Sequence, residues 1–114
     1  MRQARPAVPW IGEAQYTDGG RGVRIDSATI TGTPLFQAGL DRGDEILDLD
    51  GHATRSPADV ARAVAVHAPG QVVRATVLDR GGATRTVRLT IASDPAIEVV
   101  AAETVGAAFE GAKA

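Results

Sequence analysis

Cysteine is missing from this chain of 114 residues, and aromatic residues make up only 4% of it. Without cysteine there are no disulfide bonds, no thiolate metal ligands and no cysteine nucleophile. With so few aromatic residues, the core has to be built from Val, Ile, Leu and Ala, which favours strands and one or two short helices. The length fits one domain, so we expect a single small domain that is mainly β with two helices.

The chain also has no excess of positive charge and no long apolar run. Its 12 basic and 14 acidic residues are interspersed and give a formal net charge of −2. Binding to nucleic acid requires clustered Lys and Arg, so we expect no nucleic-acid partner. A membrane span needs ~18 apolar residues in a row, and Pro6 and Pro9 interrupt the segment where a signal peptide would lie. The sequence therefore predicts neither a membrane span nor a signal peptide.

Catalytic and metal-binding patterns are missing as well. The two histidines, His52 and His67, lie far apart in the sequence and belong to no His-Glu-x-x-His or His-x-His pattern. The chain has no Gly-x-Ser-x-Gly elbow, no phosphate-binding loop and no dinucleotide-binding fingerprint. We expect no catalytic residue, no metal and no cofactor, and so no enzymatic activity of this chain on its own.

Alternating apolar residues between Gly- and Pro-containing turns predict the order strand, strand, helical turn, strand, helix, hairpin. The expected strands are residues 10–16, 23–30 (with a bulge near 26–27), 44–50, 71–79 and 83–91, with 97–100 as a candidate extra strand. In the third strand Leu47 and Leu49 are expected to point inward. Asp44, just before that strand, is expected to accept backbone hydrogen bonds from the preceding turn.

The clearest helix is predicted for residues 56–67. Ser56 is a good N-cap, Pro57 suits the first helical position and Asp59 follows three residues after the cap. One face of this helix carries residues spaced three and four apart, namely Val60, Ala63, Val64 and His67. This apolar face could pack in the core or form one wall of a groove. For Val60 and Val64 the sequence is compatible with either location. His67 is also well placed to complement the helix dipole.

Residues 32–34 (GTP) and 38–51 (AGLDRGDEILDLDG) resemble the signature of PDZ domains, in which G-[ST]-P leads into a helical turn, A-G-L and G-D-x-I-L-x-[VL]-[ND]-G. The resemblance extends over residues 10–91. It implies a PDZ-like, partly open β-barrel or sandwich of five to six strands with one short and one longer helix. It divides the chain into a lead-in (1–9), a PDZ-like domain (10–92) and a C-terminal extension (93–114).

The order of elements is similar to the permuted bacterial type of PDZ domain, in which the carboxylate-binding loop comes first. Residues 10–13 (WIGE) resemble that loop, although Glu13 replaces an apolar residue and would repel a carboxylate. The resemblance implies that a peptide adds as a strand beside residues 13–16, with the helix as the opposite wall. The peptide-binding residues that it implies are Trp10, Ile11, Gly12, Glu13, Ala14, Gln15, Val60, Ala61, Val64 and His67.

Residues 93–100 (SDPAIEVV) resemble the tail that follows the PDZ domain of glycyl-aminopeptidase-type zinc metallopeptidases. That resemblance implies a parent peptidase whose catalytic part is not in this chain, and an exported or periplasmic location. A PDZ domain of another bacterial protease or secretion protein is the alternative parent.

The sequence is compatible with two functions. The domain either binds polypeptide segments or C-termini and presents them to the parent catalytic domain, or packs on that domain with a blocked groove. Glu13 and the candidate strand at 97–100 favour the second function, because the tail could cover a sheet edge. A homodimer through edge strands is a third arrangement.

Overall fold

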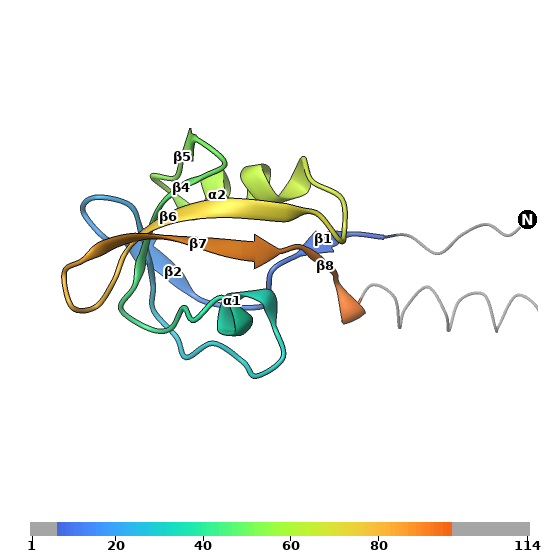
Figure 1. Ribbon diagram of the computed structural model, residues 1–114, viewed down its shortest axis with the longest axis horizontal. Helices are drawn as coiled ribbons and strands as arrows, with labels where there is room; N and C mark the ends of the chain where they lie inside the picture. Colours follow the sequence, from blue (N-terminus) through green and yellow to red (C-terminus); the bar gives the residue numbers. More distant parts are fainter. Residues whose placement is uncertain (1–6, 97–114) are drawn as a thin grey trace, which may run out of the picture.

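Ten short elements make up residues 7–96, the part of the chain that the computed structural model describes. In chain order they are β1 (Pro9–Trp10), β2 (Tyr16–Asp18), β3 (Val23–Ile25), α1 (Pro34–Gln37), β4 (Glu45–Leu49), β5 (His52–Ala53), α2 (Pro57–Ala65), β6 (Val72–Leu78), β7 (Thr84–Thr90) and β8 (Ala92–Ser93). This arrangement confirms a mainly β fold with one short and one longer helix (Figure 1).

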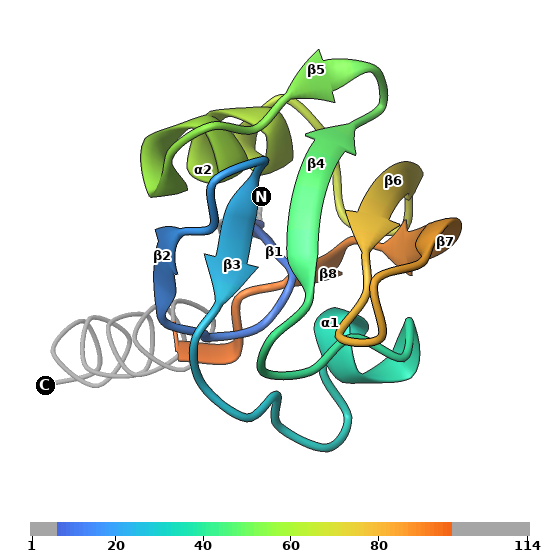
Figure 2. The same cartoon turned by 90° about the vertical axis from the view of Figure 1, so that its left-hand side faces the viewer.

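Within the described residues the strands form two antiparallel sheets. The larger has six strands in the order β2-β3-β4-β6-β7, with β5 paired to β4, and it does not close into a barrel. β1 and β8 form a separate two-stranded sheet. The hairpin of β6 and β7 crosses the middle of the molecule, with α2 above it and α1 below it in Figure 1. In Figure 2, α2 is drawn above β2, and residues of both elements line the candidate site.

A single aliphatic cluster forms the core. Strands, both helices and the connecting loops contribute to it, and Ile25, Leu35, Ile46, Val77 and Leu89 are completely buried. The two strands of the hairpin show the expected alternation, because Val73, Ala75 and Val77 point inward from β6. The predicted scarcity of aromatic residues in the core is confirmed, since no Phe or Trp belongs to the buried cluster of residues 7–96.

Two predicted strands are shorter than expected. Residues 11–15 of the segment 10–16 form no strand, because the chain turns away from β1 after Trp10 and joins the large sheet only at Tyr16. The segment 23–30 is a strand only to Ile25. Beyond it, the N–H of Asp26 donates to the carbonyl of Gln15 at 2.7 Å, and Thr29 bonds the Leu40 carbonyl through its hydroxyl at 2.7 Å. Loop backbone groups and side chains therefore form hydrogen bonds here in place of regular strand pairing.

The expectation that Leu47 points inward is wrong. Ile46 and Leu49 are buried, whereas Leu47 is only partly buried. The pairing of β4 with β6 shifts register between Ile46 and Asp48, and such a bulge reverses the alternation along a strand. Thr54 holds the irregularity in place, since its buried hydroxyl donates to the Ile46 carbonyl at 2.6 Å.

Two buried carboxylates fix the turns of the sheet. Asp44 accepts backbone hydrogen bonds as predicted, from the N–H of Asp41 at 2.9 Å and from the N–H of Arg80 at 2.9 Å. Glu45 accepts from the N–H groups of Arg21 and Gly22, at 3.3 and 3.1 Å, and so supports the turn between β2 and β3. The role of Glu45 was not foreseen from the sequence, where it was read only as a strand residue.

The ends of the described part come together. The N–H of Asp94 donates to the Val8 carbonyl at 2.9 Å, next to the pairing of β1 with β8. The candidate strand at 97–100 lies outside the described residues. Among residues 7–96 there is no helix whose length and apolar character would allow it to cross a bilayer.

Candidate peptide-binding groove

A hollow of about 360 Å³ lies between residues 8–12 and α2. Its wall is mostly apolar, and it brings α2 together with residues 8–12 and β2, which come much earlier in the sequence. The residues that line it are Val8, Pro9, Trp10, Ile11, Gly12, Tyr16, Pro57, Val60, Ala61, Val64 and Ala65. An apolar hollow of this size beside a short strand is suited to side chains of an extended polypeptide. We call it the groove.

The wall formed by α2 follows from local sequence rules. Ser56 adopts an extended conformation, and its hydroxyl accepts the N–H of Asp59 at 3.3 Å, so the helix begins at Pro57 as expected. Val60 and Val64 are only 3% and 7% exposed. Their side chains therefore belong to the core and form the floor of the groove at the same time, which answers the question left open by the sequence.

The opposite wall includes Ile11 and Gly12, which belong to a tight loop at residues 11–13. The carbonyl of Ile11 accepts the N–H of Leu35 at 3.0 Å, which ties the loop to α1. Gly12 has φ +111°, and a Cβ at this position would lie 2.7 Å from the Cβ of Thr33, so only glycine fits. Within residues 7–96, the backbone N–H groups of Ile11, Gly12 and Glu13 have no hydrogen-bond partner. Successive free N–H groups in such a loop are suited to an anion.

β2 forms the edge of the large sheet next to the groove. In the described part of the chain it pairs only with β3, so its other edge carries free N–H and carbonyl groups. Tyr16, the first residue of β2, lines the groove, and burial raises its pKa to about 12. The groove therefore combines an open strand edge, an apolar floor and a loop of free N–H groups.

The family model for the PDZ domain matches residues 13–91, more than half of the chain. The chain belongs to the PDZ domain family. The fold and element order implied by the sequence resemblance are thereby confirmed. As a PDZ domain, the chain is a peptide-binding and protein-interaction module without catalytic residues of its own.

Two curated proteins are related to this PDZ domain. The magnetosome formation protease MamE of Magnetospirillum gryphiswaldense is 34% identical over 106 residues, which cover 93% of this chain and 14% of MamE. A probable periplasmic serine endoprotease, DegP-like, of Rhizobium meliloti is 39% identical over 64 residues, which cover 56% of this chain and 12% of that protein. The chain thus spans only a small part of the length of either relative.

Two solved structures share the fold. The HtrA-type protease AlgW with decapeptide is 22% identical with a TM-score of 0.67, and the match covers 78% of this chain and 30% of AlgW. An aminopeptidase N family protein from Idiomarina loihiensis is also 22% identical with a TM-score of 0.67, and the match covers 86% of this chain and 16% of that protein. At this identity the likeness establishes the fold alone.

The PDZ domain brings together six of the ten residues that the sequence implied for peptide binding. Trp10, Ile11, Gly12, Val60, Ala61 and Val64 all line the groove. Glu13, Ala14 and Gln15 instead line a separate hollow on the other side of the loop, together with Ser27, Ala28 and Ile30.

His67 does not line the groove either. Its Nδ1 lies 2.8 Å from the Ala63 carbonyl and its Nε2 lies 3.3 Å from the Asp50 carboxylate. It therefore connects the end of α2 to the turn after β4.

Tyr16 was implied only as the end of the segment beside which the peptide adds. Four other groove residues were not foreseen from the sequence: Val8, Pro9, Pro57 and Ala65. A signal for two of them was present, because Pro57, Ala61 and Ala65 recur at four-residue spacing on α2 and so share a face. Val8 and Pro9 had no such signal. They reach the groove because β1 pairs with β8 and so runs past α2, a contact between distant parts of the chain.

Proposed function

We propose that the groove binds the C-terminal end of an extended polypeptide. The observation that carries this proposal is the combination of three unpaired N–H groups at residues 11–13 with an apolar hollow of about 360 Å³. The terminal carboxylate of the ligand accepts hydrogen bonds from the loop, and its backbone pairs with the free edge of β2. A strand has side chains on alternating sides, so every second ligand side chain enters the groove.

The chemistry of the groove selects apolar ligand side chains. Its floor is made by Val60 and Val64, and its rim includes Ala61 and Trp10. None of the side chains from α2 that line it carries a hydroxyl, amide or charge. A polar ligand side chain would lose water there without gaining a hydrogen bond, which costs free energy. Glu13, which raised the expectation of a blocked groove, lines the separate hollow instead, so its side chain does not fill the groove.

A peptide titration followed by fluorescence tests the proposal. Trp10 is the single tryptophan of the chain and lines the groove, so its emission reports directly on occupancy. A hexapeptide ending in a free Val carboxylate should change the emission with saturation, and the same peptide with an amidated C-terminus should bind at least tenfold more weakly. Equal binding of both peptides would contradict the role of the loop. The absence of binding by any apolar C-terminal peptide at millimolar concentration would favour a packing module with a blocked groove.

We further propose that the domain is an accessory part of an exported bacterial protease. Both curated relatives are named as proteases, and the DegP-like relative is named as a periplasmic serine endoprotease. These relatives favour a serine protease as parent. The zinc metallopeptidase suggested by residues 93–100 is the second candidate, and the fold shared with an aminopeptidase N family protein is consistent with it.

The two parent classes differ in their inhibitors. Peptidase activity of the full-length protein that contains this chain should be abolished by a serine-directed fluorophosphonate and should resist phenanthroline. The opposite pattern would identify the zinc enzyme. With either parent, a substrate whose C-terminal sequence binds the groove should be cleaved faster than the same substrate without that sequence, because the PDZ domain holds it near the catalytic domain.

A further inference from the structure

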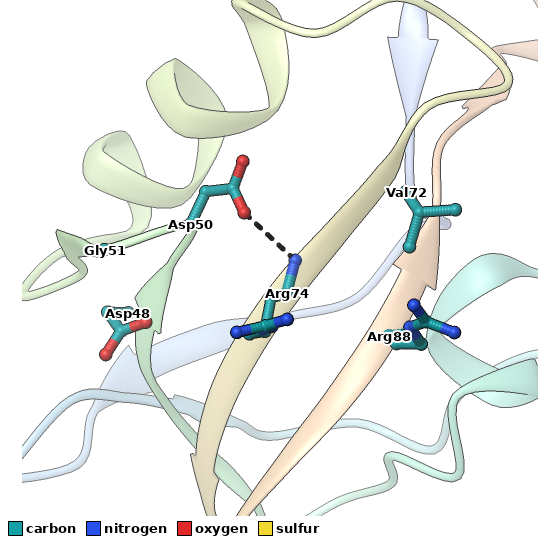
Figure 3. Close-up of a pocket in the computed structure, with 6 residues that line it drawn as sticks. All are labelled: Asp48, Asp50, Gly51, Val72, Arg74 and Arg88. Atoms are coloured by element: carbon teal, nitrogen blue, oxygen red, sulfur yellow. Dashed lines mark hydrogen bonds between the residues drawn. The ribbon is translucent and has the colours of Figure 1, made fainter.

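A second hollow lies on the outer face of the large sheet, where β4, β6 and β7 run side by side. Its volume is about 450 Å³, and it shares no residue with the groove. It is lined by Asp48, Asp50, Gly51, Val72, Arg74 and Arg88 (Figure 3). The neighbouring residues Val73 and Leu89 point into the core, so the side chains of Arg74 and Arg88 project to the outside.

Arg74 and Arg88 are direct cross-strand partners in the pairing of β6 with β7. Both side chains are exposed. Like charges placed directly opposite each other destabilise a sheet. Among residues 7–96, neither guanidinium is in an ion pair with a carboxylate. Folding stability therefore does not explain this pair, and an anion bound between the two guanidinium groups would relieve their repulsion.

The carboxylates of the hollow compensate this pair only in part, since the charge of Arg74 is the smallest of the causes that lower the pKa of Asp50. Asp50 is engaged elsewhere: its Oδ1 accepts the backbone N–H of Arg74 at 3.3 Å, and its Oδ2 lies 3.3 Å from His67 Nε2. These contacts hold the pKa of Asp50 below its ordinary value, with the backbone hydrogen bond from Arg74 as the main cause. Asp48 comes from β4, whereas Arg88 lies two strands away on β7. The hollow thus has an acidic side on β4 and a basic side on β6 and β7.

We propose that this hollow is a docking surface for an acidic polypeptide segment. Carboxylates of the segment lie over β6 and β7 and bind Arg74 and Arg88, whose planar guanidinium groups suit carboxylate oxygens. An apolar side chain of the segment covers Val72, which is 52% exposed. A segment that follows β7 keeps its acidic side chains away from Asp48. The domain then holds two polypeptide segments at once, one in the groove and one on the outer face of β4, β6 and β7.

Charge argues against nucleic acid as the occupant. Nucleic acid would place its phosphates beside the acidic side of the hollow on a chain whose net charge is −2, without the clustered basic residues that phosphate binding needs. An acidic polypeptide can place its carboxylates on the basic side of the hollow and its neutral residues on the acidic side.

A charge reversal separates this role from a structural one. In R88E the new carboxylate faces Arg74 across the hairpin, so the like-charge pair becomes an attractive pair. We expect R88E to unfold at an equal or higher temperature than the wild-type chain, while its binding to acidic peptide falls at least tenfold. R42E makes the same change of charge at an exposed loop position and is the matched control, with binding within twofold of wild type.

The probes are short peptides blocked at both ends, so that they offer no free carboxylate to the groove. Acetyl-GEVEVEG-amide should shift the amide resonances of Val72, Arg74 and Arg88, leave those of residues 11–16 in place, and bind more weakly at 0.5 M salt. Acetyl-GKVKVKG-amide should not bind wild type and should bind R88E better than wild type. Equal binding of the two peptides to wild type would overturn the proposal.

Other results would also overturn it. Amide resonance shifts that are confined to groove residues would show that the glutamate peptide binds in the groove instead. Tighter binding of a single-stranded oligonucleotide than of the glutamate peptide would indicate a phosphate site. Dimerisation of the chain that R88E abolishes would identify a second copy as the occupant. The oligonucleotide and dimerisation results leave the proposed function of the groove unaffected, because neither concerns the loop or the apolar floor of the groove.

Discussion

The buried carboxylate of Asp44 accepts the backbone N–H of Arg80 across 36 positions of sequence, at 2.9 Å. The second oxygen of the same carboxylate accepts the N–H of Asp41 at 2.9 Å, so one side chain joins the loop before β4 to the turn between β6 and β7. The guanidinium of Arg80 lies 3.7 Å from the same group. Asp44 belongs to the sequence signature that identified the family, and the structure gives it a role in folding rather than in binding.

We expect Asp44→Ala to destabilise the domain by about 2–4 kcal/mol, since two backbone donors lose their acceptor and each unsatisfied donor costs about 1–3 kcal/mol. Urea unfolding measures the loss. Asp26→Ala removes the same charge from an exposed site and should change stability by less than about 0.5 kcal/mol. Similar losses in the two variants would show that charge, and not the buried hydrogen bonds, is responsible.

Gly12→Ala should impair the groove more than the same change at Gly20. Both glycines have positive φ, of +111° and +95°, so alanine is strained at both positions. Only at Gly12 does the added Cβ also collide, with Thr33 at 2.7 Å, whereas nothing lies within 4 Å at Gly20. The loop must then move, and we expect at least tenfold weaker binding of a C-terminal peptide by Gly12→Ala. Equal affinity in the two variants would argue against the loop as the carboxylate site.

A large side chain on α2 should close the groove without unfolding the domain. Ala61 is exposed and lines the groove, whereas Ala58 is exposed on the same helix and does not line it. We expect Ala61→Trp to abolish binding of apolar C-terminal peptides and to leave the melting temperature within a few degrees of wild type. Ala58→Trp should bind normally. If Ala61→Trp binds as well as wild type, the ligand lies elsewhere.

The single tyrosine of the chain gives a pH prediction without interference from other residues. Burial raises the pKa of Tyr16 from 10.0 to about 12. Between these values the unfolded chain has lost the phenolic proton while the folded chain keeps it, so the free energy of unfolding falls as pH rises from 10 to 12. Absorbance of the phenolate should therefore appear near pH 12 in the folded domain and near pH 10 in 6 M guanidinium. A folded-state midpoint near pH 10 would mean that Tyr16 is open to solvent.

Acid should destabilise the domain below pH 4. The pKa values of Asp41, Asp50, Asp59 and Asp79 all lie below their ordinary value of 3.8, mainly because backbone N–H groups donate to each carboxylate. As pH falls, these carboxylates therefore take up protons in the unfolded chain before they do so in the folded chain. The stability that they contribute is fully present above their ordinary pKa and is lost as pH falls through the lowered pKa values.

A substitution of Asp79 tests whether backbone hydrogen bonds to carboxylates cause this loss of stability in acid. Its pKa is lowered chiefly by the N–H of Ala83, followed by that of Gly81. Asp79→Asn should make the decline in unfolding free energy between pH 4 and 2 less steep, while Asp26→Asn supplies the reference profile for the same change of charge. An unchanged slope in Asp79→Asn would contradict the assignment.

The sequence predicted most of the elements because their signals are local. Ser56 and Pro57 mark the start of α2, a Gly-containing turn separates the two strands of the hairpin, and the signature at 38–51 fixes the family. Where the prediction for a strand failed, a non-local contact decided the outcome. The bulge at Leu47 depends on pairing with β6 and on the hydroxyl of Thr54, neither of which is visible in the alternation of residues 44–50.

The sequence by itself determined the class of fold, the family and the absence of known catalytic patterns, since capping, turns and a contiguous motif act over a few residues. Only the tertiary structure decided which predicted residues share the groove, because that depends on the path of β1 past α2 and on the chain turning at Gly12. It also placed Arg74 against Arg88, through a register that no single strand reveals. Contacts between distant segments depend on the packing of the whole core, and no local pattern encodes them.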